Sequence, residues 1–391
     1  MRTWVARTLG VTVVATVALA SLGGPVAADE AVSTSFPEDF PEILDASLGT
    51  PVIGFGASGP VSRTPVVFLH GNNDTPYPTP CNGGFGHMLD FAQWFHDNGY
   101  ARSELWGLGY QGEQCDILVD PSLKSGEAHT AAANVADVRA FVHAVLDHTG
   151  AEQVDVVGHS LGGIVPREWM RQDDAHHLVR RLVMVDSPNH GIINCSPSPR
   201  NYFAPSAAGG FSPDSGICVE FGAADTPFLE ALNADPTPGP TRYLVIRNAD
   251  TSFVYFPEQD GAFPPVPAEN RRGEPHDFSH SAELPGVPVV DLTGQGIHDT
   301  ALLTAHIGIS NSPDAFAAAF DFLTAPDDAP APDDGASTSD EVPAGVEDPT
   351  PTPEEGRPAP SPLPATGAGA GWAIGVVAVA LLVRRRPIRS A

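Results

Sequence analysis

A lone serine stands among glycines in the segment GHSLGG, where an apolar run ends and a helical pattern begins. Gly158 and Gly162 flank Ser160 in the order G-x-S-x-G. Small residues at these positions permit a tight strand-to-helix turn, and such a turn raises the serine hydroxyl above the sheet. We therefore predict that Ser160 is a nucleophile. The alternative is a glycine-rich turn with a capping serine.

A serine hydroxyl is a weak nucleophile unless a histidine accepts its proton. On this kind of turn the chain order is serine, then an acid, then the histidine. Two histidines follow the last predicted strand, His298 and His306. We predict His306 as the base because it lies shortly before the apolar face of the final helix, on a loop that must return over the sheet. His298 is the alternative base, or else a loop or supporting residue.

The acid is expected at the end of a strand that precedes the histidine. Asp250 follows the apolar segment YLVIR, where a carboxylate could hold the imidazole in the required tautomer. Asp186, at the end of the strand before, is the alternative acid. Either aspartate could instead cap a helix or form a turn. For Asp250 the chain order and the strand-end position favour the catalytic role.

Acyl transfer also requires two donors for the oxyanion of the tetrahedral intermediate. The backbone amide of Leu161 follows the serine directly and is the first expected donor. The apolar segment VVFLHG ends at Gly71, so we expect the amide of Asn72 to point into the same site. The alternative is that His70 and Gly71 form only a turn.

Strand and helix patterns alternate along residues 61–325, the stretch that must position these side chains. The apolar runs predict six strands, at residues 64–71, 103–110, 153–160, 178–188, 241–250 and 287–294. Helical spacing predicts helices within residues 85–100 and 126–150, and a last one that begins at Ser312 and Pro313.

This alternation predicts an α/β fold, with a mostly parallel sheet of about six strands and helices on both faces. In such sheets reactive groups gather at the carboxyl ends of the strands, where Ser160 is expected. Residues 192–240 and 251–285 are rich in Pro, Gly and aromatic residues and interrupt the alternation. We expect them to form two loop-rich insertions above the strand ends.

The segments VVFLHGNN, VDVVGHSLGG and VDSPNHGI, with the order of Asp250 and His306, resemble the class 2 lipases of the α/β-hydrolase superfamily. These are secreted bacterial lipases, and extracellular poly(hydroxyalkanoate) depolymerases are close to them. The resemblance implies an α/β-hydrolase fold, the triad and oxyanion roles given above, and no metal or organic cofactor. The chain departs from the smallest members in its two insertions and in His298.

The leading interpretation is a serine carboxylic ester hydrolase, a lipase or esterase, that acts on triacylglycerols or other acyl esters through an acyl-enzyme. The same triad could serve a polyester depolymerase or a wall-lipid acyltransferase. A catalytically inactive surface-display module is the alternative of another class, but no triad member is missing from the sequence.

Residues 1–28 have the pattern of a secretory signal peptide. Arg2 and Arg7 precede an apolar stretch over residues 11–22, and small residues precede Asp29. The alternative is a retained membrane anchor. We interpret residues 29–60 as an N-terminal extension of the domain.

Residues 363–391 resemble the sorting signal of Gram-positive surface proteins. The motif LPATG is followed by an uncharged stretch to Val383 and by three arginines. The resemblance implies that sortase cuts between Thr366 and Gly367 and transfers Thr366 to peptidoglycan. We therefore predict a secreted protein anchored to the cell wall, held in the membrane as a precursor. An ordinary C-terminal membrane anchor is the alternative.

Residues 326–362 are predicted to be an acidic, proline-rich disordered linker. Residues 326–360 alone carry ten Asp or Glu against one Arg, too polar a composition to form a core. Extended at roughly 3 Å per residue, the linker could span on the order of 100 Å. The net charge of −28 on the 391 residues argues against nucleic acid as a partner. The oligomeric state stays open.

Four cysteines in an exported chain predict two disulfide bonds, and three pairings are possible. Local closure favours Cys81 with Cys115, and Cys195 with Cys218. No C-x-x-C pair occurs, which disfavours a metal site.

Overall fold

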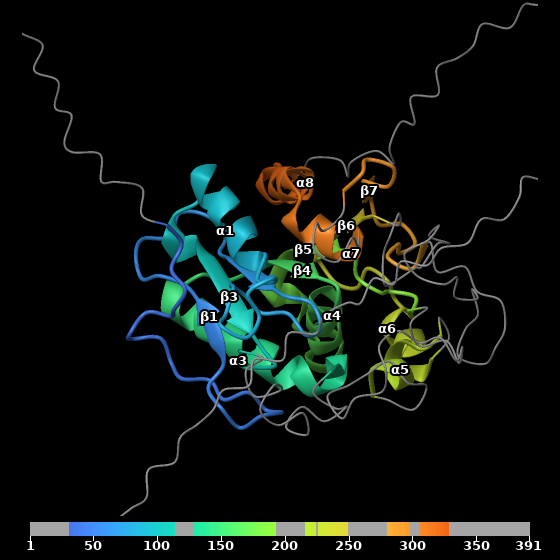
Figure 1. Cartoon of the computed structure of the whole chain (residues 1–391), viewed down its shortest axis with the longest axis horizontal. Helices are drawn as coiled ribbons and strands as arrows, with labels where there is room; N and C mark the ends of the chain where they lie inside the picture. Colours follow the sequence, from blue (N-terminus) through green and yellow to red (C-terminus); the bar gives the residue numbers. More distant parts are fainter. Residues whose placement is uncertain are drawn as a thin grey trace, which may run out of the picture. The chain divides into compact units, whose positions relative to one another are not determined.

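A computed structural model of the chain describes residues 31–113, 129–192, 216–223, 226–248, 280–297 and 305–327. All of them belong to one compact unit, residues 1–338 (Figure 1). The predicted signal peptide, nearly all of the acidic linker and the sorting signal fall outside the described residues. These three assignments therefore stay predictions.

The described residues form a seven-stranded sheet in the order β1-β3-β2-β4-β5-β6-β7. β1 is antiparallel to β3, and every other neighbouring pair is parallel. The strands are β1 (Ile53–Phe55), β2 (Val66–Leu69), β3 (Leu105–Gly109), β4 (Val154–His159), β5 (Val179–Val185), β6 (Arg242–Arg247) and β7 (Val289–Asp291). All six predicted strands are present.

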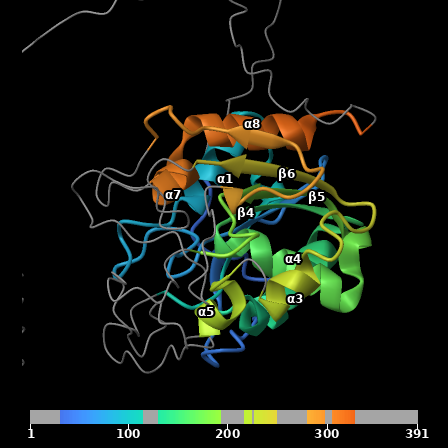
Figure 2. The same cartoon turned by 90° about the vertical axis from the view of Figure 1, so that its right-hand side faces the viewer.

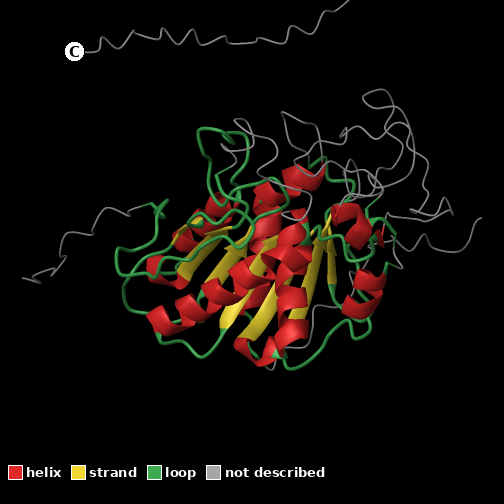
Figure 3. Ribbon diagram, turned by 90° about the horizontal axis from the view of Figure 1, so that it is seen from below, coloured by secondary structure: helices red, strands yellow, loops and turns green. Residues whose placement is uncertain are grey.

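Helices cover both faces of this sheet, as predicted for a parallel sheet. In order they are α1 (Met88–Asp97), η1 (Arg102–Glu104), α3 (Ala131–Thr149), α4 (Leu161–Asp173), η3 (Ala175–Leu178), α5 (Gly216–Phe221), α6 (Pro227–Leu232), α7 (Ala305–Gly308), η6 (Ile309–Asn311) and α8 (Pro313–Thr324). α3 and α4 pack on one face, and α1 and α8 pack on the other (Figures 2 and 3). Among these helices, none has the length and apolar character of a membrane span.

Local sequence explains where the long helices begin and end. The side chain of Thr130 accepts a hydrogen bond of 3.1 Å from the amide of Ala133 and so caps α3. α3 ends at Gly150, whose φ of 70° is the left-handed conformation that favours glycine. α8 begins after Ser312 with Pro313 in its first turn, as predicted.

The N-terminal segment, predicted as an extension of the domain over residues 29–60, contributes a strand to the sheet. β1 lies within this segment and pairs with β3. The ring centroid of Phe40 lies 5.0 Å from that of Trp106 on β3. A three-residue strand is too short to show a period of two, so its sequence carried no strand signal. The folded unit therefore includes residues before position 61.

The two predicted insertions fall mostly outside the described residues. From the first, the structure describes the short helices α5 and α6, and from the second only residues 280–285. The described end of the first insertion departs from this expectation: Leu232, Asp235 and Pro238 line a cavity with His176, beside the amino end of β5, because this stretch leads into the start of β6. For the rest of both insertions the expected position above the strand ends stays a prediction.

Candidate active site

Ser160 occupies the turn between β4, which ends at His159, and α4, which begins at Leu161. Its φ of 54° and ψ of −124° are a strained conformation for a residue with a side chain, costing on the order of 1–3 kcal/mol. The Ser160 amide donates a 2.9 Å hydrogen bond to the carbonyl oxygen of Val185 on β5. The sharp corner predicted from G-x-S-x-G is therefore present.

Both glycines of the motif are required by packing. A Cβ atom on Gly158 would lie 2.1 Å from the carbonyl oxygen of Gly162. A Cβ atom on Gly162 would lie 2.3 Å from the carbonyl oxygen of Leu69, at the end of β2. Because both obstacles are main-chain atoms, neither can move aside easily. The steric reason for small neighbours of the serine is thus confirmed.

His306 lies against this serine. Its Nε2 is 2.9 Å from the hydroxyl oxygen of Ser160, although the two residues are 146 positions apart. His306 belongs to α7, in the segment that leads into α8, and only 8% of its surface is exposed. The structure therefore pairs the serine with His306, and His298 lies outside the described residues.

The carboxylate beside His306 belongs to Asp186. Its Oδ2 is 2.8 Å from Nδ1 of His306, and its Oδ1 accepts a hydrogen bond of 3.1 Å from the amide of Asn248. Asp186 is completely buried. A carboxylate only accepts, so the imidazole carries its proton on Nδ1 and its Nε2 accepts the hydrogen bond of the Ser160 hydroxyl.

The preference for Asp250 as the acid is corrected accordingly. Asp250 lies outside the described residues, and Asp186, the alternative, occupies the position beside the imidazole. The reason is strand register: β5 is the neighbour of β4, and Val185 pairs with His159. Ser160 and Asp186 each follow one of these paired residues, so they emerge side by side at the sheet edge.

The two predicted oxyanion residues flank the serine. Leu161 is the first residue of α4, and the amides of a first helical turn have no acceptor within the helix. Gly71 brings the loop after β2 next to the serine, because a Cβ atom on it would lie 3.1 Å from the Cβ of Ser160. The donor roles of the Leu161 and Asn72 amides stay predictions.

Two buried residues that the sequence analysis did not single out hold the loop after β2. The side-chain oxygen of Asn72 accepts hydrogen bonds from Nε2 of Gln111 at 3.1 Å and from Nδ1 of His129 at 2.6 Å. The amide of Asn73 donates to Oε1 of Gln111 at 3.0 Å. Gln111 lies two residues after Gly109, the last residue of β3, and this strand-end position is the sequence signal that could have identified it.

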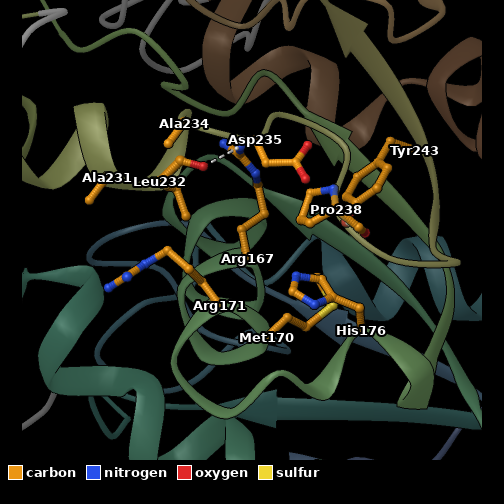
Figure 4. Close-up of a pocket in the computed structure, with 10 residues that line it drawn as sticks. All are labelled: Arg167, Met170, Arg171, His176, Ala231, Leu232, Ala234, Asp235, Pro238 and Tyr243. Carbon is orange, nitrogen blue, oxygen red and sulfur yellow. Dashed lines mark hydrogen bonds between the residues drawn. The ribbon is translucent and has the colours of Figure 1, made fainter.

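A cavity of about 250 Å³ lies between the second half of α4, η3, the loop after α6 and the start of β6 (Figure 4). Arg167 lines it and donates hydrogen bonds to Asn189 and to the carbonyl oxygen of Leu232. Burial lowers the pKa of Arg167 to about 10. His176 and Tyr243 place this cavity at the amino ends of the strands, opposite Ser160. We assign it no part in the candidate active site.

The predictions about metal ions and disulfide bonds can be compared only with the described residues. No cluster of three or more His, Cys, Asp or Glu side chains suited to a metal ion occurs among the described residues. Cys81 and Cys218 are disulfide-bonded, whereas Cys115 and Cys195 lie outside the described residues. The predicted pairing therefore stays a prediction.

A largely parallel sheet in this order, with helices on both faces and a serine on the turn after its central strand, defines an α/β-hydrolase. The chain belongs to the class 2 lipase family, whose sequence pattern matches residues 63–260, about half of the chain. By family and fold it is thus a hydrolase of the lipase and esterase type. No curated protein sequence matches the chain.

Solved structures with a similar fold include two forms of the lipase BlEst2 of Bacillus licheniformis. The propeptide form is 19% identical with a TM-score of 0.47, and the match covers 72% of this chain and 55% of that one. The mature form is 19% identical with a TM-score of 0.45, and the match covers 70% of this chain and 98% of that one. Aspergillus fumigatus lipase B is 15% identical with a TM-score of 0.41, and the match covers 67% of this chain and 53% of that one.

Proposed function

We propose that the chain is a serine carboxylic ester hydrolase that acts on acyl esters through a covalent acyl-enzyme. One observation carries the proposal: Ser160 Oγ lies 2.9 Å from Nε2 of His306, whose Nδ1 lies 2.8 Å from Asp186. In this arrangement Ser160 is the nucleophile, His306 the general base and Asp186 the acid that orients the imidazole.

In the first half-reaction, the oxygen of Ser160 attacks the ester carbonyl carbon while Nε2 of His306 takes the hydroxyl proton. The carbonyl oxygen becomes an oxyanion, for which the amides of Leu161 and Asn72 are the proposed donors. The bond from the carbonyl carbon to the alcohol oxygen then breaks. The alcohol leaves with the proton from His306, and the acyl group stays on Ser160.

In the second half-reaction, His306 takes a proton from a water molecule, whose oxygen attacks the acyl carbon. The bond to Ser160 breaks, the proton returns to the serine oxygen, and the carboxylic acid is released. Asp186 accepts the hydrogen bond from Nδ1–H throughout, which favours the imidazolium formed in each transition state. The cycle uses only the ester and water.

Membership of the class 2 lipases supports acyl esters, triacylglycerols among them, as the substrate class. The segments that would face the acyl chain lie largely outside the described residues. Chain-length preference is therefore assigned by experiment, with p-nitrophenyl butyrate against p-nitrophenyl decanoate.

The test uses the purified full-length chain, its Ser160→Ala variant and a matched control, Ser103→Ala. Ser103 is also buried, but it lies at the amino end of β3 and donates to the carbonyl oxygen of Pro60. We expect turnover in the wild type and the control, loss of about 10³-fold or more in Ser160→Ala, and a p-nitrophenyl phosphonate adduct on Ser160. Equal turnover in wild type and Ser160→Ala, or none in either, would contradict the proposal.

We further propose that the chain is exported and attached to the cell wall through Thr366. The order of LPATG, apolar stretch and arginines supports attachment, and the N-terminal pattern supports export. In a sortase-containing Gram-positive host, the wild type should be released only by wall-degrading enzymes. Thr366→Ala should shift the chain to the membrane or the medium, and an unchanged wall fraction would contradict the assignment.

A further inference from the structure

His159, the last residue of β4, contacts the main chain of His306. Its Nε2 lies 2.7 Å from the carbonyl oxygen of His306, and the two rings have centroids 4.8 Å apart at an angle of 38°. Only 3% of His159 is exposed. The strand that presents the serine therefore also holds the backbone of the residue proposed as base.

The hydrogen bond fixes the tautomer of His159. A carbonyl oxygen only accepts, so Nε2 of His159 carries the proton and Nδ1 has a free lone pair. Nδ1 is buried and makes no hydrogen bond to any described residue. It faces Gly71, where a Cβ atom would lie 3.1 Å away. A second proton on Nδ1 would have no acceptor there.

His159 is consequently held neutral beside the proposed base. Its pKa is well below the usual value for histidine, first because of burial and then because His306, His87 and His70 lie nearby. When His306 becomes positively charged in the transition state, a neutral neighbour adds no repulsion. The contact is therefore maintained in both protonation states of His306.

The segment that carries His306 needs such an anchor. α7 is a single turn of four residues, and an isolated helix of this length has no stability of its own. The bonds of His306 to Ser160 and Asp186 are both near 2.9 Å and depend on where its main chain lies. A misplacement of about 1 Å at a reacting group can cost about 10²-fold in rate.

We propose that His159 is a positioning residue of this site, whose Nε2 proton fixes the main chain of His306 so that the imidazole meets both Ser160 and Asp186. The inference rests on the proposed hydrolase function. The positioning role further predicts that an amide side chain can replace the His159 imidazole as donor to the carbonyl oxygen of His306, whereas a hydrocarbon side chain cannot.

The test compares His159→Gln, which keeps a donor near the position of Nε2, with His159→Leu, which has none. His176→Leu is the matched control, because His176 is also buried but lies at the amino end of β5. For p-nitrophenyl butyrate we expect kcat to fall about 10- to 100-fold in His159→Leu, with KM within about threefold. His159→Gln should recover at least about fivefold of that loss, and the control should keep the wild-type kcat.

An unchanged kcat in His159→Leu would overturn the proposal, as would equal losses in His159→Leu and His159→Gln, since bulk packing would then explain both. Imidazole ¹⁵N spectra of the wild type decide the matter even if the leucine variant does not fold. They should show His159 as the neutral Nε2–H tautomer throughout neutral pH, and an Nδ1–H tautomer would refute the contact. Wild-type turnover that vanishes in Ser160→Ala preserves the proposed function whichever result His159 gives.

Discussion

The replacement Asp186→Asn tests the carboxylate assignment most directly. Oδ1 of Asp186 accepts from the amide of Asn248, and Oδ2 accepts from Nδ1 of His306. An asparagine of the same shape must keep its oxygen toward the Asn248 amide, which leaves its NH₂ group facing the imidazole. Because NH₂ only donates, Nδ1 must become the acceptor, and the ring proton moves to Nε2. Nε2 then cannot accept the proton of Ser160.

We expect this wrong tautomer to reduce kcat by about 10⁴-fold, which corresponds to about 5.4 kcal/mol in the transition state. KM should change little, because the lost interaction matters only when the imidazole takes a proton. The fold should persist, since the hydrogen bond from Asn248 remains. The assay is steady-state hydrolysis of p-nitrophenyl butyrate, with thermal unfolding to verify the fold.

The matched control is Asp250→Asn, at the position that the sequence analysis preferred. It should keep kcat within about threefold of wild type. The reasoning is refuted if Asp250→Asn loses several orders of magnitude while Asp186→Asn remains active. Comparable losses in both variants would equally contradict a single orienting carboxylate.

Three further predictions concern stability. Gly162→Ala should lower the free energy of unfolding by about 2–3 kcal/mol, because its Cβ would meet a main-chain oxygen of β2 at 2.3 Å. Gly150→Ala, whose Cβ meets only open space, should lower it by about 1 kcal/mol. Equal losses in denaturant titrations would contradict the steric argument. Burial raises the pKa of Asp137 to about 7, so between about pH 4 and pH 7 this carboxyl is protonated to a greater extent in the folded chain than in the unfolded chain, and its contribution to the free energy of unfolding falls as pH rises. Asp137→Asn should flatten that fall by up to about 1.4 kcal/mol per pH unit, and an unchanged slope in denaturant unfolding would refute the buried titration. Non-reducing peptide mapping should recover one disulfide bond within residues 81–115 and one within residues 195–218. Each should add about 3 kcal/mol to the free energy of unfolding. A disulfide-linked peptide that joins the two ranges would contradict local closure.

The sequence predicted the architecture well because buried parallel strands are continuous apolar runs. The six predicted strands are all present, and α8 begins after Ser312 with Pro313 in its first turn, as the sequence predicted. Periodicity works here because each of these elements buries a whole face against its neighbours. β1 was missed because three residues are too few to show any period.

Residues of the candidate site were predictable where local sequence alone fixes them. The turn at Ser160 requires its glycines, and both lie within the six-residue segment GHSLGG. The choice between Asp186 and Asp250 depends on which strand is the neighbour of β4, and strand order is a tertiary property. Gln111 and His159 act through contacts with distant segments, so neither stood out before the strands were assembled.

β1 also determines how much of the chain is needed for a soluble folded unit. A shortened chain that started at residue 61 would leave the outer hydrogen-bonding row of β3 open and would uncover Trp106, which Phe40 now shields. An open edge of this kind pairs readily with a second molecule, so the shortened chain would tend to aggregate. Expression of the hydrolase unit should therefore begin ahead of Val32, which packs in the same core as Phe55 of β1.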